Sequence, residues 1–362
     1  MMIRRHGFGR LVWPLLVAAS APLVQAADNV TKVAFVYVGP VGDSGWSYQH
    51  DVARKAMEQH FGGRVKTSFV ENVPATADAE RVIRQLAASG NTLIFTTSFG
   101  YMEPTLKVAK LFPKVKFEHA TGFKTAPNVV TYETRFHEGA YLLGVLAGKL
   151  SRSNTLGYVA SFPIPEVIRN IDAFTLGARS VNPKARTRVV WVDTWYDPGK
   201  ERQAAEALVA QGADMLCQNT DSAAVVQTAE RLGVGACGWD SDMAKYGPKA
   251  QYAANTQNWT DYYIGEVQKL LDGAWTGNRA TVGGLKEKMV VISPLNKSVP
   301  ADVSKLIDER RNAIMSGQLN PFAGPLKDNA GKQRVPAGTT MTPEQLMAIN
   351  WYVDGVEGSV PK

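Results

Sequence analysis

The segment KVAFVYVGPVGDSGWSYQH, residues 32–50, contains the transition on which the fold depends. Its apolar, β-branched first part, Lys32–Val38, predicts a buried strand. The glycine-rich polar stretch that follows predicts a turn, and a helical pattern then runs from Tyr48 to Phe61. A strand, a polar turn and a helix in this order begin a βαβ unit, and such units build parallel sheets.

The same alternation continues along the chain. Further strands are expected at residues 65–70, 92–97, 116–119, 155–160, 187–192, 215–219 and 235–239. Further helices are expected at residues 77–89, 102–111, 138–150, 167–181, 201–211, 223–232 and 262–271. The pattern restarts near residue 138, so we expect an α/β protein with two lobes, each a parallel sheet flanked by helices.

Residues 1–26 have the pattern of a cleaved secretory signal. Arg4, Arg5 and Arg10 form a basic head, an apolar run follows over 11–24, and 24–26 (Val-Gln-Ala) supply small residues for cleavage. The run is shorter than the ~20 residues of a membrane span, which disfavours an anchor. The residues that follow Arg5 fit the twin-arginine export pattern poorly. No Cys follows the apolar run, so a lipid anchor at that position is not expected. We expect a periplasmic mature protein that begins near Ala27.

Charge and motifs disfavour several function classes. The chain carries +7, and removal of the three signal arginines leaves +4 on a chain with no long basic run. A nucleic-acid partner is therefore not expected. No phosphate-binding loop, catalytic motif or metal-like Cys/His cluster occurs, so we expect neither an enzyme nor a cofactor or metal. Glu118 beside His119 is the one pair that could suggest catalysis, but adjacent residues on a strand point to opposite faces of the sheet.

The two cysteines, Cys217 and Cys237, fall on strands that we expect to be neighbours. An exported protein can keep a disulfide, but the bridge requires favourable geometry. We expect two buried free thiols, with a disulfide as the alternative.

Ligands of open parallel sheets bind beyond the carboxyl ends of the strands. An aromatic residue recurs there beside a carboxylate or amide. The aromatic side chains would sandwich a flat ring, and the carboxylates and amides would hydrogen-bond to its edge. Asp43 and Asp221 could instead be helix N-caps, Trp239 a core residue and Tyr101 a surface residue. The expected ligand-binding residues are Asp43, Trp46, Ser47, Phe99, Glu118, Trp195, Tyr196, Asn219, Asp221 and Asp240.

Six segments in this order resemble the basic membrane protein family of substrate-binding proteins, which includes purine nucleoside receptors of ABC importers. They are GPVGDSGW, TTSFGY, RFHEGAYLLGVLAGKLS, FTLGARSVNP, YDPGKERQAAEALVAQGADML and GWDSDM. The resemblance covers about residues 32–331. It implies a periplasmic type I fold whose lobes are joined by three crossover segments, near 131–135, 253–257 and 291–296. The N-terminal lobe would comprise 27–133 plus 257–291, and the C-terminal lobe 134–256 plus 292–362.

The resemblance also implies roles for individual residues. Trp46 takes the place of the family's base-stacking Phe in a motif that begins at Asp43, whereas Ser47 departs from the family's Asn. A second stacking residue falls on Trp195 or Tyr196, and Asp240 matches the family's acidic residue. The nucleoside receptors carry a Lys at the second crossover, but residues 255–259 read NTQNW. This difference favours a bare, adenine-like nucleobase over a nucleoside.

The expected function is that of a periplasmic solute-binding component of an ABC importer, with a permease and an ATPase as partners. Closure of the hinge would trap a purine between the lobes of a monomer. Two alternatives from the same fold are a nucleoside-binding importer component and a sensor that docks on a membrane receptor or kinase. A nucleoside hydrolase is the least favoured reading.

Overall fold

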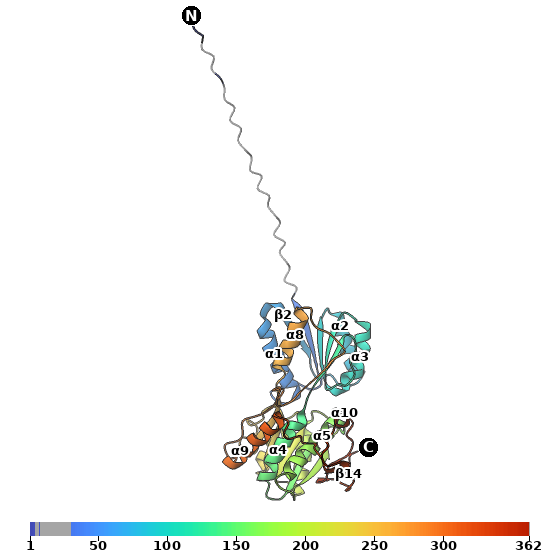
Figure 1. Cartoon of the computed structure of the whole chain (residues 1–362), viewed down its shortest axis with the longest axis vertical. Coiled ribbons are helices and arrows are strands. Elements are labelled where there is room, and N and C mark those ends of the chain that lie inside the picture. Colours follow the sequence, from blue (N-terminus) through green and yellow to red (C-terminus); the bar gives the residue numbers. More distant parts are fainter. Residues whose placement is uncertain (4–6, 8–29, 362) are drawn as a thin grey trace.

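The computed structural model describes residues 1–3, 7 and 30–361, which form two α/β lobes one above the other (Figure 1). The expected signal segment lies outside these residues, apart from 1–3 and 7. In the described ranges, no helix has both the length and the apolar character that a membrane crossing requires.

The first lobe is built on a parallel sheet whose strand order is β11-β5-β4-β3-β1-β2. Helices α1 and α8 pack together on one face, and α2 and α3 pack together on the other (Figure 1). The strands are β1 (Thr31–Tyr37), β2 (Val65–Val70), β3 (Leu93–Thr97), β4 (Lys116–Ala120), β5 (Val129–Thr134) and β11 (Ala280–Gly283). The helices are α1 (Trp46–Phe61), α2 (Ala77–Ala88), α3 (Met102–Leu111) and α8 (Thr260–Leu271).

The second lobe has the strand order β12-β10-β9-β8-β6-β7-β15, parallel except for β12. Its strands are β6 (Thr155–Ala160), β7 (Arg186–Trp191), β8 (Met215–Asn219), β9 (Gly235–Asp240), β10 (Gln251–Gln257), β12 (Val290–Ile292) and β15 (Val356–Glu357). Its helices are α4 (Phe136–Leu150), α5 (Pro165–Arg179), α6 (Pro198–Ala210), α7 (Ala224–Leu232), α9 (Ala301–Met315) and α10 (Pro343–Met347). These two sheets confirm the expected fold class.

Where a proline opens a helix, the helix begins a few residues earlier than the sequence predicted. Helix α6 was expected from residue 201 but starts at Pro198, whose fixed φ suits the first helical position. The Asp197 side chain caps this helix by accepting hydrogen bonds from Gly199 N and Lys200 N, both at 3.0 Å. The same proline rule explains the start of α5 at Pro165.

The chain passes between the lobes near two of the three expected positions. It leaves the first sheet after β5, and it returns after β10, because α8 packs against α1. The third passage differs from the expected segment 291–296. Val290 and Ile292 already belong to β12, which pairs antiparallel with Gln257 and Asn255 of β10. The chain has therefore entered the second lobe before residue 290, between β11 and β12.

Cys217 on β8 and Cys237 on β9 lie on neighbouring strands, and both are buried free thiols. This arrangement agrees with the expected pair of buried free thiols.

Helices α4 and α5 approach so closely that glycine is required at their contact. A Cβ atom on Gly144 would lie 1.9 Å from the carbonyl oxygen of Phe174, and one on Gly177 would lie 2.0 Å from that of Tyr141. Because backbone atoms cannot move aside as a flexible side chain can, any larger residue would push the two helices apart.

We expect Gly144→Ala to lower the free energy of unfolding by about 3 kcal/mol, the upper part of the usual overpacking range. Urea unfolding followed by circular dichroism would measure the change. The matched control is Gly265→Ala in α8, where a new Cβ meets nothing within 4 Å. That control should be neutral or stabilising by up to ~1 kcal/mol. Equal unfolding midpoints for the two variants would contradict the proposed helix contact.

Candidate functional site

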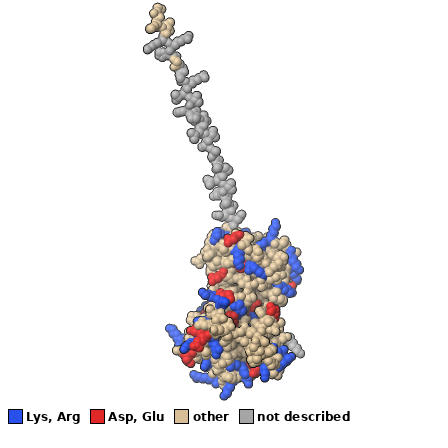
Figure 2. Space-filling model, viewed as in Figure 1, with Lys and Arg blue, Asp and Glu red and all other residues tan. Residues whose placement is uncertain are grey.

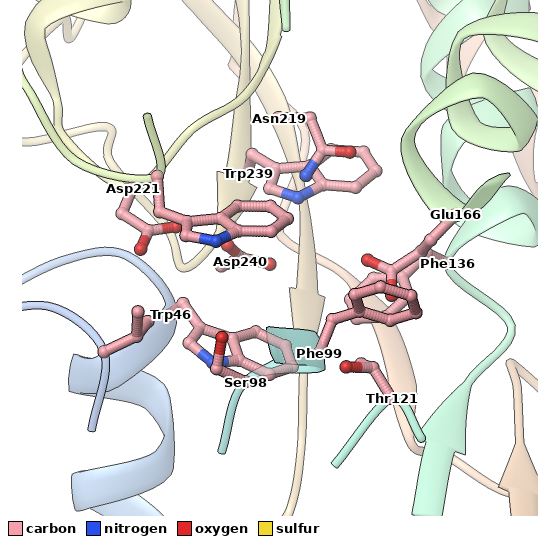
Figure 3. A pocket seen from close by; sticks show the side chains of 12 residues that line it. Trp46, Ser98, Phe99, Thr121, Phe136, Glu166, Asn219, Asp221, Trp239 and Asp240 are labelled. Carbon is pink, nitrogen blue, oxygen red and sulfur yellow. The ribbon is translucent and has the colours of Figure 1, made fainter. Parts of the chain in front are cut away.

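A cavity lies between the lobes, where the carboxyl ends of strands from both sheets meet (Figure 3). The first lobe contributes residues that follow β1, β3 and β4, and the second lobe contributes the ends of β8 and β9. The lining residues are Val38, Trp46, Ser98, Phe99, Thr121, Phe136, Glu166, Trp195, Asn219, Asp221, Trp239 and Asp240.

Part of the predicted set meets in this cavity. The expected residues that line it are Trp46, Phe99, Trp195, Asn219, Asp221 and Asp240. Of the two aromatic alternatives after β7, Trp195 lines the cavity, whereas Tyr196 is 42% exposed and lines a separate outer hollow. Ser47 does not line the cavity, and its hydroxyl oxygen accepts a hydrogen bond from Gly39 N at 3.3 Å.

Glu118 is not brought to the cavity, contrary to expectation. It lies two residues before the end of β4 and is fully buried inside the first lobe. Its carboxylate accepts hydrogen bonds from the Tyr262 hydroxyl at 2.6 Å and from Trp275 Nε1 at 2.7 Å. It therefore anchors α8 and the following loop. His119 instead contacts Thr96 on a neighbouring strand, through Nδ1 at 2.9 Å.

Asp43 is also outside the cavity, at the rim, where it connects the two lobes. One carboxylate oxygen lies 2.6 Å from Lys245 Nζ, and the other accepts a hydrogen bond from the Tyr246 hydroxyl. Asp43 is not an N-cap, because α1 is preceded by Gly45 without any side-chain cap. Asp221 is not one either, since the residue that precedes α7 is Ala223.

Further contacts hold the lobes closed around the cavity. Gly45 N donates to Ser241 Oγ at 2.7 Å, and Gln49 Nε2 donates to the carbonyl oxygen of Gln257 at 2.6 Å. Gly45 has φ +88°, and a Cβ there would lie 2.1 Å from the carbonyl oxygen of Asp221. Only glycine combines this backbone conformation with this close approach.

Six lining residues lie outside the expected ligand-binding set: Val38, Ser98, Thr121, Phe136, Glu166 and Trp239. Phe136 begins α4 directly after β5, although the helix was expected to start at residue 138. Glu166 lies near the start of α5, several residues after the end of β6. Pro165, which opens α5, was the available signal for Glu166. Trp239 was treated as a possible core residue, and it is both 1% exposed and part of the lining.

The aromatic walls are held rigidly. Trp46 Nε1 donates to the carbonyl oxygen of Thr97 at 2.6 Å, and the indole meets His50 edge-to-face at 4.3 Å between ring centroids. On the other side, Phe136 stacks on Trp239 with a centroid distance of 6.1 Å and an interplanar angle of 20°. Figure 3 shows Trp46 and Trp239 on opposite sides of the cavity, with Phe136 at one end. Fixed aromatic faces of this kind suit a flat or apolar-faced ligand.

Carboxyl groups dominate the polar part of the cavity. Burial raises the pKa of Asp221 well above its ordinary value, and the charge of Glu201 adds to the effect. Burial, then the charges of Asp221 and Glu166, raise the pKa of Asp240 in the same way. Burial and the nearby Glu133 carboxylate raise the pKa of Glu166 to about 8, with Arg169 opposing the shift. The Glu166 carboxyl therefore retains its proton near neutral pH in the ligand-free protein.

Neighbouring amides orient two of the lining residues. With its amide nitrogen turned toward Asp240, Gln257 lies 2.9 Å from Asp240 Oδ1. Asn219 Oδ1 accepts a hydrogen bond from Asn170 Nδ2 at 3.2 Å, which leaves the Asn219 NH₂ group to donate. Asp240 and Thr121 have φ values of 60° and 59°, and such strained backbone is concentrated at functional sites.

The lining contains no Lys, Arg or His, as far as the described residues extend. Those residues also include no cluster of three or more side chains suited to a metal ion. The lining thus offers carboxyl and amide groups without a balancing cationic side chain, which suits a neutral or cationic ligand whose N–H or O–H groups can donate to the carboxyl oxygens.

The Glu166 carboxyl gives the site a testable pH dependence. Its folded pKa of about 8 is above its ordinary value of 4.5. The stability that it contributes is therefore complete below about pH 4.5 and is lost as the pH rises through 8. We expect the urea midpoint of the ligand-free protein to decrease as the pH is raised from 5 to 9. Glu166→Gln should make this decrease with pH smaller. An unchanged slope would contradict the assignment, and exposed Glu309→Gln is the control.

Comparisons with known proteins agree with this architecture. Residues 30–320 match the family model Bmp, described as ABC transporter substrate-binding protein PnrA-like. A purine-binding protein of Brucella abortus is 49% identical over 336 residues, 93% of this chain and 95% of that protein. A Haloferax volcanii protein, whose name assigns it provisionally to glucose binding for an ABC transporter, is 36% identical over 333 residues, 92% of this chain and 82% of that protein.

A solved structure shows the same arrangement of lobes. An ABC transporter solute-binding protein from Conexibacter woesei superposes with a TM-score of 0.66 and 25% identity, over 80% of this chain and 98% of that one. The family and the fold are those of substrate-binding proteins rather than enzymes. Since the family model spans most of the sequence, the chain belongs to the Bmp family of PnrA-like ABC transporter substrate-binding proteins.

Proposed function

We propose that this protein binds an adenine-like purine nucleobase between its lobes in the periplasm and delivers it to the permease and ATPase of an ABC importer. The observation that carries the proposal is the lining of the interlobe cavity. Among the described residues that line it, aromatic side chains lie beside three carboxyl groups, and none of these lining residues is cationic.

The lining discriminates among ligand classes through charge and hydrogen bonding. A phosphorylated nucleotide or an acidic heterocycle would place negative charge next to Glu166, Asp221 and Asp240 without a compensating cation, which is costly in a buried site. Adenine is neutral, flat and carries N–H donors on two edges. Its ring would lie against Trp46, and its donors would face the carboxyl groups.

The relatives supply one supporting and one competing ligand. The Brucella abortus relative is named for purine binding, which supports the proposal. The Haloferax volcanii relative is named for glucose binding, and a sugar would also place hydroxyl donors against carboxylates. Rigid indole faces on both lobes favour the flat ring, because stacking on such a face is worth about 1–3 kcal/mol per base.

Binding to the ligand-free protein tests the proposal directly. Isothermal titration calorimetry on protein refolded without ligand should detect adenine binding and no glucose binding. Trp46→Ala should weaken adenine binding by about 10- to 100-fold, because the stacking face is lost. The matched aromatic control is Tyr196→Ala, which lies beside the cavity but does not line it. Glucose binding in the absence of adenine binding would contradict the purine assignment.

The rim contact predicts a kinetic effect on the same ligand. Asp43 and Lys245 are exposed, with 65% and 53% of their side-chain surface accessible, so their ion pair is weak and screened by salt. Asp43→Asn should raise the dissociation rate of adenine by about two- to fivefold at low salt and by less at high salt. Stopped-flow Trp fluorescence would measure it. A rate that is unchanged at every salt concentration would show that this contact does not hold the closed state.

Surface charge agrees with a small-molecule role. On the face shown in Figure 2, Lys and Arg are scattered over both lobes with Asp and Glu among them. This distribution differs from the basic stripe that nucleic-acid binding requires. A sensor role on a membrane receptor uses the same ligand cavity, and reconstitution with the cognate permease and ATPase would separate the two roles through ligand-dependent ATP hydrolysis.

A further inference from the structure

A second chamber, of about 230 Å³, adjoins the ligand cavity. Phe99, Thr121 and Glu166 line both spaces. Figure 3 shows Thr121 and Glu166 on the same side of the ligand cavity. The junction therefore has a polar frame, and a group attached to a ring in the first cavity can extend past it.

Beyond the junction, the chamber has apolar walls contributed by both lobes. Phe123 follows β4 in the first lobe, and Met347 ends α10 in the second lobe. These side chains are 56% and 43% exposed, which is unfavourable for a phenyl ring and a thioether that contact only water. The rings of Phe99 and Phe123 have a centroid distance of 6.4 Å, so they form one continuous aromatic surface.

The charged groups at the far end of the chamber are already paired. Arg169 on α5 forms an ion pair with Glu133 on β5, and the two side chains are only 5% and 13% exposed. The pairing offsets both charges within the protein, although Arg169 Nε is buried without a hydrogen-bond partner. The surface that lacks a partner is thus the apolar one made by Phe99, Phe123, Pro165 and Met347.

We propose that this chamber receives an apolar substituent on the bound heterocycle, so that the ligands of this protein include purines that carry an alkyl or aryl group. Glu166, at the junction, accepts the N–H that joins the substituent to the ring. The inference rests on the proposed function, because it requires a purine ring in the first cavity. A sugar substituent would instead direct its hydroxyl groups at apolar walls.

Calorimetry with matched probes tests the chamber separately from the cavity. The probes are adenine, N6-benzyladenine and adenosine. N6-benzyladenine should bind about tenfold more tightly than adenine, because part of its phenyl group is removed from water. Phe123→Ala and Met347→Ala should each reduce this difference by about threefold while leaving adenine affinity unchanged. The control is Leu111→Ala on α3, since Leu111 is 55% exposed and lines neither space.

The outcomes separate this inference from the proposed function. Adenine binding with N6-benzyladenine bound no more tightly would overturn the chamber assignment alone. Adenosine bound more tightly than both other probes would also overturn it, in favour of a hydroxylated substituent. Binding of none of the three would overturn the proposed function and, with it, the assignment of the chamber.

Discussion

The approach of Gly45 to the carbonyl oxygen of Asp221 brings the first lobe into contact with the second, and the geometry of the cavity depends on it. Gly45 immediately precedes α1, so its position also fixes where Trp46 starts that helix. The hydrogen bond from Gly45 N to Ser241 Oγ places the end of β9 against the same turn. One glycine turn therefore sets the distance between the indole wall of the first lobe and the carboxyl groups of the second.

Both sheets run their strands toward this contact, which explains how residues far apart in sequence share one small space. Parallel strands end at a common edge, and the two edges face one another across the hinge. The cost of the arrangement is that several carboxyl groups are buried together. Asp221, Asp240 and Glu166 each have a raised pKa because of this burial. A ligand with hydrogen-bond donors relieves that cost, which couples its affinity to the protonation of the site.

Sequence reasoning was successful where a local signal and a global rule agreed. The strand–turn–helix order near Trp46 predicted the α/β class, and the strand-end rule found Asn219, Asp221 and Asp240. It failed for Glu118, because β4 continues to Ala120 and holds that carboxylate within the lobe. Glu166 was missed because α5 begins several residues after β6, and Phe136 was missed because its helix was expected to begin at residue 138. Strands β11 and β12 have at most four residues, and their pairing depends on contacts remote in sequence.

The buried state of the two cysteines has a practical consequence. Burial raises the pKa of the Cys217 thiol well above its ordinary value, and Cys237 is equally enclosed on the next strand. Thiol-directed dyes must reach the sulfur atom, so two buried native thiols compete poorly for label under mild conditions. A single cysteine introduced on an exposed face of each lobe would then carry a fluorophore pair without removal of the native residues. The chain is in this respect already suited to single-molecule observation of how its lobes open and close.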